Sequence, residues 1–386
     1  MKKITAAIIG TGFIGAEHIE AVRRLGFVEI VALAEVTQAV ADQKCEQFSI
    51  PRGTADWREL IDDPEIQVIH NCTGNNLHYE INRAALLAGK HILSEKPLAM
   101  TTDETAELAR LAANSGCVNA VNLNYRQFAQ VQNARANIAN GKLGDVMLVH
   151  GSYLQDWLLF DTDYNWRLDP KLGGESRALA DVGSHWCDTV MHVIGAEIVE
   201  VLADVATIIP VRKRAKVAVA TFSNQELSAD DYEAVPISTE DYATVIFKLS
   251  NGARGVFTVS QVSAGKKNCF SFEVDGSKAA LAWNQEEPEK LWFGYREKAN
   301  EIMLADAALF EPAARPYLTH PGGHNEGWPD GLKNMMANFY GYIRDGKDVR
   351  LEKPTFATFA DGDRVMKVVA AILKSGREGR WIKVNG

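Results

Sequence analysis

Apolar residues occur in short runs over the first third of the chain, with longer amphipathic stretches between them. The runs predict strands at 4–9, 29–34, 68–71, 91–94 and 118–122. The stretches between them predict helices at 14–24, 36–47, 57–61, 77–88 and 103–115. Strands that are apolar on both faces are typical of a covered parallel sheet. The alternation therefore predicts an α/β arrangement, a doubly wound parallel sheet of the Rossmann type.

The pattern changes after about residue 125, where strands follow one another without helices between them. These strands are predicted at 146–153, 199–208, 243–249, 255–262, 268–274, 278–283 and 291–294. Helices are predicted at 129–139, 181–194, 327–344 and 357–374. Asn251-Gly252 and Asp275-Gly276 are typical of tight hairpins. We therefore predict two domains, 1–124 and 125–386, the second an α+β domain with a large, mainly antiparallel open sheet.

One tract departs from both patterns. Arg212-Lys213-Arg214 precedes a polar stretch at 223–239 that carries several acidic residues. A tract of this kind predicts a solvated loop.

Composition and charge narrow the class of protein. The chain has 386 residues, and 41 Lys and Arg against 50 Asp and Glu give a net charge of −9, which argues against nucleic acid as a partner. The five cysteines are scattered, which argues against a disulfide framework or a four-thiolate zinc site. No apolar run reaches the roughly 18 residues that a membrane span needs. We expect a cytoplasmic protein without a membrane partner.

A glycine motif follows the first predicted strand and opens the first predicted helix. Gly10, Gly12 and Gly15 form a G-x-G-x-x-G, with Phe13 and Ile14 between the last two. In this context Gly10 permits a tight turn, Gly12 lets a pyrophosphate approach the backbone, and Gly15 permits close packing. The motif predicts a dinucleotide site that these five residues line; the alternative is a flexible glycine turn.

The choice of dinucleotide depends on Glu35, which lies 20 residues after Gly15. A carboxylate at this spacing binds the ribose hydroxyls of the adenosine. It repels a 2′-phosphate, and no Arg or Lys follows at 36–38. We therefore expect NAD rather than NADP as the cofactor, with no metal.

The third main strand is followed by a segment rich in turn residues, at 71–78, on the same edge of the sheet. Thr73, Asn76 and His78 are its candidate cofactor contacts. Asn76 is equally well explained as a helix N-cap, and His78 as a structural histidine.

Two further groups could carry chemistry. Glu95-Lys96-Pro97 ends the fourth main strand and places a charged pair at the cofactor edge, where Lys96-Pro97 is a candidate cis peptide bond. Asp181, His185 and Asp188 are spaced i, i+4 and i+7, which is one face of a helix. An Asp–His pair one turn apart can act as a general base for alcohol oxidation. A structural pair and a metal site remain alternatives.

These groups together resemble a known family. The glycine motif, Glu95-Lys96-Pro97, and a match from Trp166-Arg167 through Gly173-Gly174 to D-x-G-x-H-x-x-D at 181–188 resemble the glucose–fructose oxidoreductase/inositol dehydrogenase (Gfo/Idh/MocA) family. Glu175 departs from the family pattern, which often has a third glycine there.

The resemblance implies roles for these residues. It implies that Lys96, Asp181 and His185 are catalytic, with His185 the base backed by Asp181, and Lys96 holding the reacting hydroxyl and stabilising alkoxide charge. Which of Lys96 and His185 takes the proton is open. Glu95 and Lys96 would line the cofactor site. The segment 122–126 resembles the family's Asn- and Arg-rich segment, which implies Asn124 at the cofactor and Arg126 at the substrate.

Aromatic and polar residues around the predicted cleft suggest a carbohydrate substrate. Indole and phenol rings stack on the apolar face of a sugar, and His, Asp and Arg bind hydroxyls. The candidates, besides Lys96, Arg126, Asp181 and His185, are Tyr153, Asp156, Trp157, Trp166, Arg167 and His324. The alternative for each aromatic residue is a place in the core.

The sequence thus predicts a nicotinamide-binding domain over 1–124 and a domain for substrate binding and oligomerisation over 125–386. The predicted reaction is the reversible oxidation of a secondary hydroxyl of a sugar, glycoside, anhydrosugar or cyclitol to a ketone. One alternative retains NAD tightly and uses transient oxidation for glycoside hydrolysis or isomerisation. Another is a non-catalytic nucleotide-sensing subunit. The resemblance implies a homodimer or homotetramer.

Overall fold

The computed structural model describes residues 3–216 and 228–384, which form two compact units. The first unit comprises Met1–Asn133 and Ala305–Met366, and the second comprises Ala134–Leu304 and Lys367–Gly386. The division differs from the predicted boundary at 124/125, because a late segment of the chain packs with the first unit.

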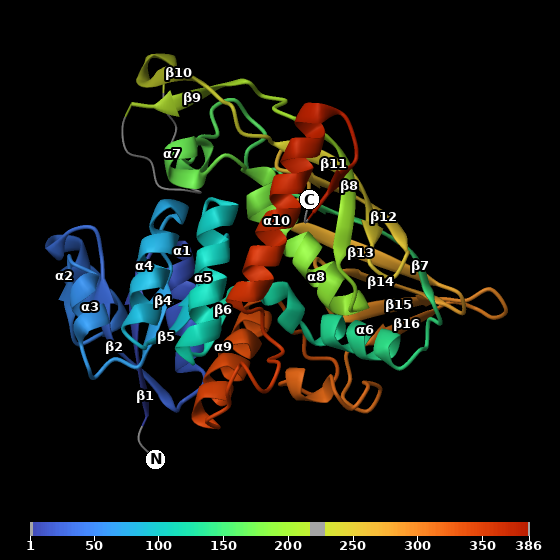
Figure 1. Ribbon diagram of the computed structural model, residues 1–386, viewed down its shortest axis with the longest axis horizontal. Helices are drawn as coiled ribbons and strands as arrows, with labels where there is room; N and C mark the ends of the chain where they lie inside the picture. Colours follow the sequence, from blue (N-terminus) through green and yellow to red (C-terminus); the bar gives the residue numbers. More distant parts are fainter. Residues whose placement is uncertain (1–2, 217–227, 385–386) are drawn as a thin grey trace. The chain divides into compact units, whose positions relative to one another are not determined.

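The first unit contains a six-stranded parallel sheet in the order β3-β2-β1-β4-β5-β6 (Figure 1). Its strands are β1 (Ile4–Ile9), β2 (Val28–Ala34), β3 (Gly53–Thr54), β4 (Val68–Asn71), β5 (His91–Ser94) and β6 (Asn119–Val121). Its connecting helices are α1 (Phe13–Arg23), α2 (Gln38–Phe48), α3 (Arg58–Asp62), α4 (Asn75–Leu87) and α5 (Thr102–Ser115). This order confirms the doubly wound sheet, and its topology reverses between β1 and β4, where such sheets bind ligands.

Helix α9 (Trp328–Arg344) explains why residues 305–366 belong to the first unit. It packs along α1, and Leu332 and Phe339 share a buried core with Ile19 and Val22. The apolar face of α1 is therefore covered by a helix that lies more than 300 residues later in the chain.

The second unit contains a nine-stranded sheet in the order β16-β15-β14-β13-β7-β12-β11-β8-β17. The strands are β7 (Val146–Leu154), β8 (Ile198–Ala206), β11 (Tyr242–Leu249), β12 (Arg254–Ser260), β13 (Cys269–Gly276), β14 (Ala280–Asn284), β15 (Lys290–Gly294), β16 (Glu301–Leu304) and β17 (Ile382–Lys383). Only β7 and β12 pair in parallel; the other neighbours in this sheet are antiparallel. The predicted mainly antiparallel sheet is confirmed.

Helices accompany this sheet. Helix α8 (Ser184–Ile194) packs on β7, and Trp186 stacks on Phe257 of β12 with ring centroids 4.3 Å apart. Short α7 (Pro170–Gly173) precedes it, while α6 (Ala129–Ala139) and α10 (Phe359–Glu378) each cross from one unit's residues to the other's. A buried apolar core therefore lies on the α8 side of the sheet.

The basic tract at 212–214 is not a solvated loop. Strand β9 (Val211–Ala215) pairs in antiparallel fashion with β10 (Tyr232–Pro236), and Arg212 is fully buried. Its guanidinium donates to the carbonyl oxygens of Leu158, Phe160 and Asp163 at 2.8–3.1 Å. The prediction was wrong for Arg212, because its charge binds backbone acceptors and not water. Residues 217–227 of the tract lie outside the described residues.

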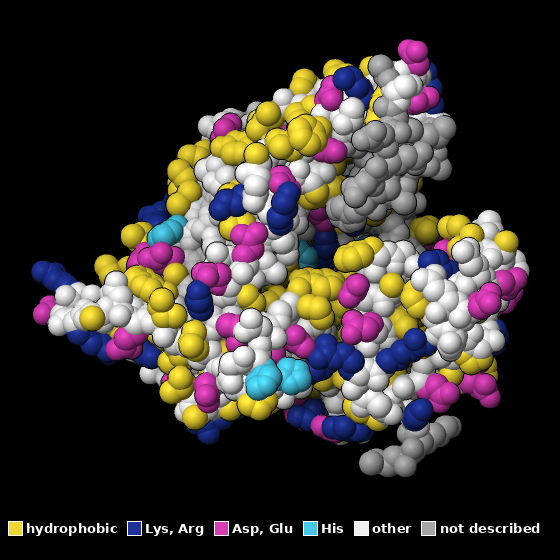
Figure 2. All heavy atoms as spheres, turned by 180° about the vertical axis from the view of Figure 1, so that it is seen from behind, with side chains coloured by type: hydrophobic (Ala, Val, Ile, Leu, Met, Phe, Trp, Pro, Cys, Tyr) yellow, Lys and Arg dark blue, Asp and Glu magenta, His cyan; other side chains and the backbone are white. Residues whose placement is uncertain are grey.

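Several apolar side chains on the strands of the second unit are exposed to solvent. They include Met147, Leu148, Ile246, Val256 and Ile302. Figure 2 shows exposed apolar side chains interspersed with charged ones on the surface. Within the described residues, every helix is too short or too polar to cross a membrane.

Candidate active site

The glycine-rich loop has the geometry that the motif predicts. Gly10 has a φ of +84°, and a Cβ there would lie 2.8 Å from the carbonyl oxygen of Cys72. A Cβ on Gly15 would lie 2.1 Å from the carbonyl oxygen of Gly10. Apart from its own chain neighbours, no described residue comes within 4 Å of a Cβ placed on Gly12, which is the N-cap of α1. The loop is therefore closed on the protein side and open at Gly12, which suits an approaching pyrophosphate.

Glu35 is held against the same loop. Its Oε1 accepts hydrogen bonds from the backbone amide and the hydroxyl of Thr11 at 2.5 and 2.6 Å. Its Oε2 accepts a longer hydrogen bond from the amide of Val36, at 3.3 Å. A half-buried carboxylate fixed at the end of β2 fits the predicted contact with a ribose.

The segment 71–78 is shaped by its own side chains. The ring nitrogens of buried His78 lie 2.6 Å from the carbonyl oxygen of Pro97 and 3.1 Å from that of Thr73, and burial lowers the pKa of this imidazole. Both nitrogens face protein carbonyls, so His78 ties the loop together, and the predicted cofactor contact rests on Thr73 and Asn76. Asn76 is exposed within α4, whose N-cap is Gly74.

The turn that follows β5 directs the carboxylate of Glu95 into the protein interior. Glu95 is 5% exposed, and its Oε1 lies 3.0 Å from Nε2 of His18 and 2.6 Å from Nδ2 of Asn122. Burial opposes ionisation, but the hydrogen bond and charge of His18 and the charge of Lys96 lower the pKa of Glu95 to about 2. Lys96 is half-buried, and the Lys96–Pro97 peptide bond is cis. The Glu95 carboxylate therefore supports the turn from beneath.

The segment after β6 contains two buried polar residues. Asn124 is 2% exposed, and its Nδ2 has no hydrogen-bond partner among the described residues. An amide donor buried in this way suits a ligand contact, as predicted. Arg126 lies 3.3 Å from Asp361, an ion pair in which both side chains are buried.

In the second unit, the predicted Asp–His pair lies where two kinds of helix join. Asp181 belongs to a π-helix at Leu179–Gly183 (η3), and His185 lies in the first turn of α8. Single π-turns inside helices occur often at functional sites. Asp181 Oδ2 accepts a hydrogen bond from Gln261 at 2.8 Å, and its Oδ1 lies 3.7 Å from Nε of Arg167. His185 is 7% exposed, and Asp188 is fully buried.

Aromatic residues predicted to bind substrate lie near this pair in the second unit. The ring of Tyr153 lies 6.4 Å from that of His185, and its hydroxyl donates to Asn268 at 2.6 Å. Trp166 stacks under the guanidinium of Arg167, which lies 4.5 Å from the ring centroid. The structure thus brings together Tyr153, His185, Asp181, Arg167 and Trp166 through contacts within one unit.

Two other predicted substrate residues have protein partners. Asp156 accepts from the amide of Gly265 at 3.0 Å and from Lys267 at 2.8 Å, and the Lys267 hydrogen bond lowers the pKa of this carboxyl. Trp157 donates to Gln155 at 2.9 Å and stays half-buried.

His324 lies in the first unit, on an exposed loop where its Nδ1 faces the carbonyl oxygen of Pro321 at 3.1 Å. The same loop leads to Trp328, which stacks on Phe13 of the glycine motif with centroids 6.2 Å apart. Lys96 belongs to the same unit, whereas Asp181 and His185 belong to the other.

Sequence reasoning missed several residues that support the site. Gln261 is fully buried, and its Oε1 accepts from Arg177 while its amide donates to Asp181. Nothing in the sequence marks a glutamine after a strand for this role. His18 could have been noticed, because it interrupts the buried stripe of α1 formed by Gly15, Ile19 and Val22.

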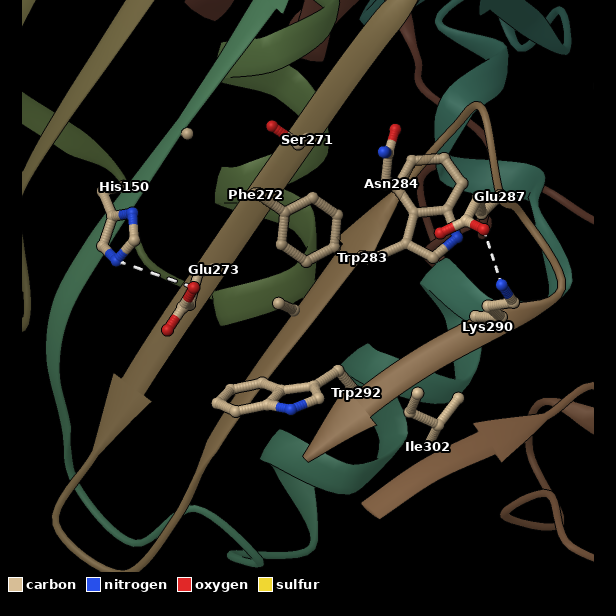
Figure 3. Close-up of a pocket in the computed structure, with 12 residues that line it drawn as sticks. His150, Ser271, Phe272, Glu273, Trp283, Asn284, Glu287, Lys290, Trp292 and Ile302 are labelled. Carbon is tan, nitrogen blue, oxygen red and sulfur yellow. Dashed lines mark hydrogen bonds and ion pairs between the residues drawn. The ribbon is translucent and has the colours of Figure 1, made fainter. Parts of the chain in front are cut away.

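A separate pocket lies on the second unit's sheet and is lined by none of the predicted site residues. Figure 3 shows His150 of β7 directed toward Glu273 of β13, with Trp292 nearby. Ligand atoms of His150, Glu273 and Asp275 lie within 4.8 Å of one another. His150 is exposed, so this cluster lies at the surface.

A Rossmann-type sheet with an open glycine loop, together with a second unit that presents an Asp–His pair, defines a dinucleotide-dependent oxidoreductase. The chain belongs to the Gfo/Idh/MocA family: residues 4–123 match its oxidoreductase model with an NAD-binding Rossmann fold, and residues 131–282 match its C-terminal domain model. The resemblance found in the motifs is confirmed.

Two of the similar proteins below are named for their activity on a carbohydrate, and the third is named only as an oxidoreductase. The chain is 29% identical to a levoglucosan dehydrogenase of Pseudarthrobacter phenanthrenivorans, over 100% of this chain and 99% of the relative. A solved levoglucosan dehydrogenase in complex with NADH and levoglucosan matches with a TM-score of 0.88 at 26% identity, over 100% of both chains. An oxidoreductase domain protein from Kribbella flavida matches with a TM-score of 0.89 at 29% identity, over 100% of both chains.

Proposed function

We propose that this protein is an NAD-dependent dehydrogenase that oxidises a secondary hydroxyl of a sugar, glycoside, anhydrosugar or cyclitol to a ketone, reversibly. One observation carries the proposal: Asp181 is fixed by Gln261 and Arg167 one helical turn before His185, with Tyr153 beside the imidazole. An acid–base pair with an adjacent phenol ring suits the deprotonation of a carbohydrate hydroxyl.

In the proposed reaction, His185 takes the hydroxyl proton, and Asp181 stabilises the resulting imidazolium. Lys96 holds the reacting oxygen and stabilises alkoxide charge. Bound nicotinamide supplies the acceptor for the hydride. The open backbone at Gly12 and the buried amide of Asn124 are the features of this chain that suit the cofactor.

The cofactor is proposed to be NAD rather than NADP. Glu35 is anchored by Thr11 at the end of β2, where it meets the adenosine ribose in sheets of this type. Its negative charge repels a 2′-phosphate. The relatives solved with NADH support this choice.

The test is turnover of NAD with a carbohydrate panel that includes levoglucosan, glucosides and inositols, followed by the absorbance of reduced nicotinamide. Lys96→Ala is expected to lower kcat by at least about 10²-fold, the usual cost of removing a donor to a developing oxyanion. Unchanged circular dichroism is the control for folding. Full retention of activity by Lys96→Ala would contradict the assigned role.

The same experiment discriminates among the alternatives. NAD that stays bound through purification, with product formed and no net reduction, indicates hydrolysis or isomerisation through transient oxidation. Loss of activity in chelator indicates a metal at Asp181, His185 and Asp188. NAD binding without turnover of any substrate indicates a sensing subunit.

We also propose a homodimer or homotetramer that works in the cytoplasm. The exposed apolar side chains on the second unit's strands support association of copies. The five free thiols support a reducing compartment.

A further inference from the structure

A line of buried, hydrogen-bonded polar side chains crosses the first unit beneath the turn that carries Lys96. Nε2 of His18 lies 3.0 Å from Glu95 Oε1, and Nδ1 of His18 lies 3.0 Å from Nδ1 of His70. Nε2 of His70 lies 2.6 Å from the hydroxyl of Tyr340. Glu95 is 5% exposed, and the other three are fully buried.

The direction of these hydrogen bonds follows from the chemistry of the groups. The Glu95 carboxylate only accepts, so Nε2 of His18 donates to it. Burial lowers the pKa of His70 well below its usual value, so His70 is neutral and donates through one ring nitrogen while accepting through the other. The line therefore leaves each ring nitrogen with a partner and ends on the carboxylate.

Stability alone does not account for this arrangement. Buried ion pairs and polar chains are commonly no more stable than apolar side chains of the same volume. Here they are drawn from four different elements, the helices α1 and α9, the strand β4 and the turn after β5. Buried ionisable groups with strongly shifted protonation are found preferentially at functional sites.

The carboxylate at the end of the line acts directly on the turn. Glu95 Oε2 accepts a hydrogen bond from the backbone amide of Lys96 at 3.3 Å, and the two side-chain charges attract one another. A second donor, Nδ2 of Asn122, reaches Glu95 Oε1 at 2.6 Å. The titratable groups that face Glu95 are His18, Cys72, His78 and Lys96.

We propose that His18 and Glu95 are positioning residues for Lys96: His18, oriented by His70 and Tyr340, holds the Glu95 carboxylate ionised beneath the turn, and this fixed anion sets the place of the Lys96 ammonium. The inference rests on the proposed dehydrogenase function. Its chemical consequence is that protonation of Glu95 releases Lys96 and slows the reaction.

The test uses ratios of variant to wild-type kcat/KM at several pH values, which cancel the titration of groups common to both proteins. His18→Leu removes the donor while burial still favours the neutral carboxyl, so the pKa of Glu95 rises toward the neutral range. The ratio for His18→Leu is expected to fall by about tenfold from pH 8 to pH 6. For Glu95→Gln and for the double variant the ratio is expected to be low and independent of pH.

Two variants guard against a merely structural effect. His18→Gln keeps a donor near the position of Nε2. Its ratio of kcat/KM to that of the wild type is therefore expected to change little with pH. Lys90→Met removes hydrogen bonds from a buried lysine to the carbonyl oxygens of Asp63 and Ile66, just before β5 begins. This substitution disturbs the opposite end of the same strand. The ratio of its kcat/KM to that of the wild type is therefore expected to be near one at every pH. If His18→Leu does not fold, Asn122→Leu removes the other donor to Glu95 and serves the same test.

An infrared readout does not depend on turnover. The carbonyl stretch of a protonated carboxyl is expected at pH 7 in His18→Leu and absent from the double variant with Glu95→Gln. A pH-independent ratio for His18→Leu, or wild-type kcat in Glu95→Gln, would overturn the proposal. If the wild-type protein turns over no carbohydrate, the proposed function fails, and the infrared band still decides whether His18 keeps Glu95 ionised.

Discussion

The amide of Gln261 orients Asp181, the carboxylate that we propose stabilises the base His185. It donates to Asp181 at 2.8 Å and is itself fixed by Arg177, which is buried and lies 3.5 Å from Asp241. A hydrogen bond to a charged group contributes about 1.5–3 kcal/mol. Asp181 therefore depends on a buried scaffold for its orientation.

Replacing Gln261 tests this dependence. Gln261→Met keeps the volume and removes the donor, so kcat is expected to fall by about 10- to 100-fold, with a smaller change in the KM for carbohydrate. Thr239→Val is the matched control, because the Thr239 hydroxyl accepts a hydrogen bond from Nε of Arg177 at 3.2 Å and so belongs to the same buried scaffold. An equal loss of kcat in both variants would contradict a specific role for Gln261.

The lowered pKa of the buried Glu95 carboxyl predicts that the stability of the protein depends on pH. Its pKa is lowered to about 2 in the folded chain, from a usual value of 4.5. A lowered folded pKa stabilises the chain above pH 4.5, and this stabilisation is lost as the pH falls toward 2. The difference in free energy of unfolding between wild type and Glu95→Gln is expected to shrink by about 3 kcal/mol from pH 7 to pH 2. Urea titrations of both proteins at several pH values measure it, and a difference that is independent of pH would argue against an ionised Glu95.

At the scale of elements, the hairpin of β9 and β10 carries the loop that precedes the Trp166-Arg167 pair. Arg212 of β9 binds three carbonyl oxygens of the segment 158–163, and Leu158 and Leu168 pack with Ile237 in a small core beside it. The loop is therefore held by one buried guanidinium, by the backbone amide and ammonium of Lys213, which bind Asp161, and by a few apolar contacts.

Two arginines of one strand offer a matched comparison. Arg212→Met leaves buried carbonyls without a donor and is expected to lower the free energy of unfolding by about 3 kcal/mol. It should also speed hydrogen exchange over 156–165. Arg214→Met removes an exposed pair with Glu233 and is expected to change stability by less than about 1 kcal/mol. Similar small effects from both variants would show that the buried guanidinium is not what holds the loop.

The elements of the first unit were largely predictable, because each has a strong local pattern. The strands 4–9, 68–71 and 91–94 agree with the structure residue for residue. The Asp181–His185 spacing also predicted a helical pair, but it gave no sign of the π-turn, which depends on a shifted backbone hydrogen bond from Ser184 to Leu179. Strand β9 was missed because its charged residues mimic a solvated loop, and Arg212 is paired only through distant parts of the chain.

At the scale of the whole molecule, the exposed apolar side chains of the second unit predict association. Ile246 and Val256 are partners across β11 and β12, and both are exposed. Light scattering is expected to give the mass of a dimer or tetramer, and Ile246→Lys is expected to shift it toward the monomer, because a buried unpaired charge is costly. Leu87→Lys, at an exposed position on α4 of the first unit, is a control for added charge. A wild-type monomer would refute the proposal.

The return of α9 to the first unit has a consequence for how the chain is made. During synthesis, the ribosome releases residues 1–133 long before residues 305–366. The apolar face of α1 therefore stays uncovered while strands β7 to β16 of the second unit are synthesised. A nascent chain stalled before residue 305 should present this face to chaperones, and a gene fragment that ends at residue 124 should yield an aggregation-prone domain.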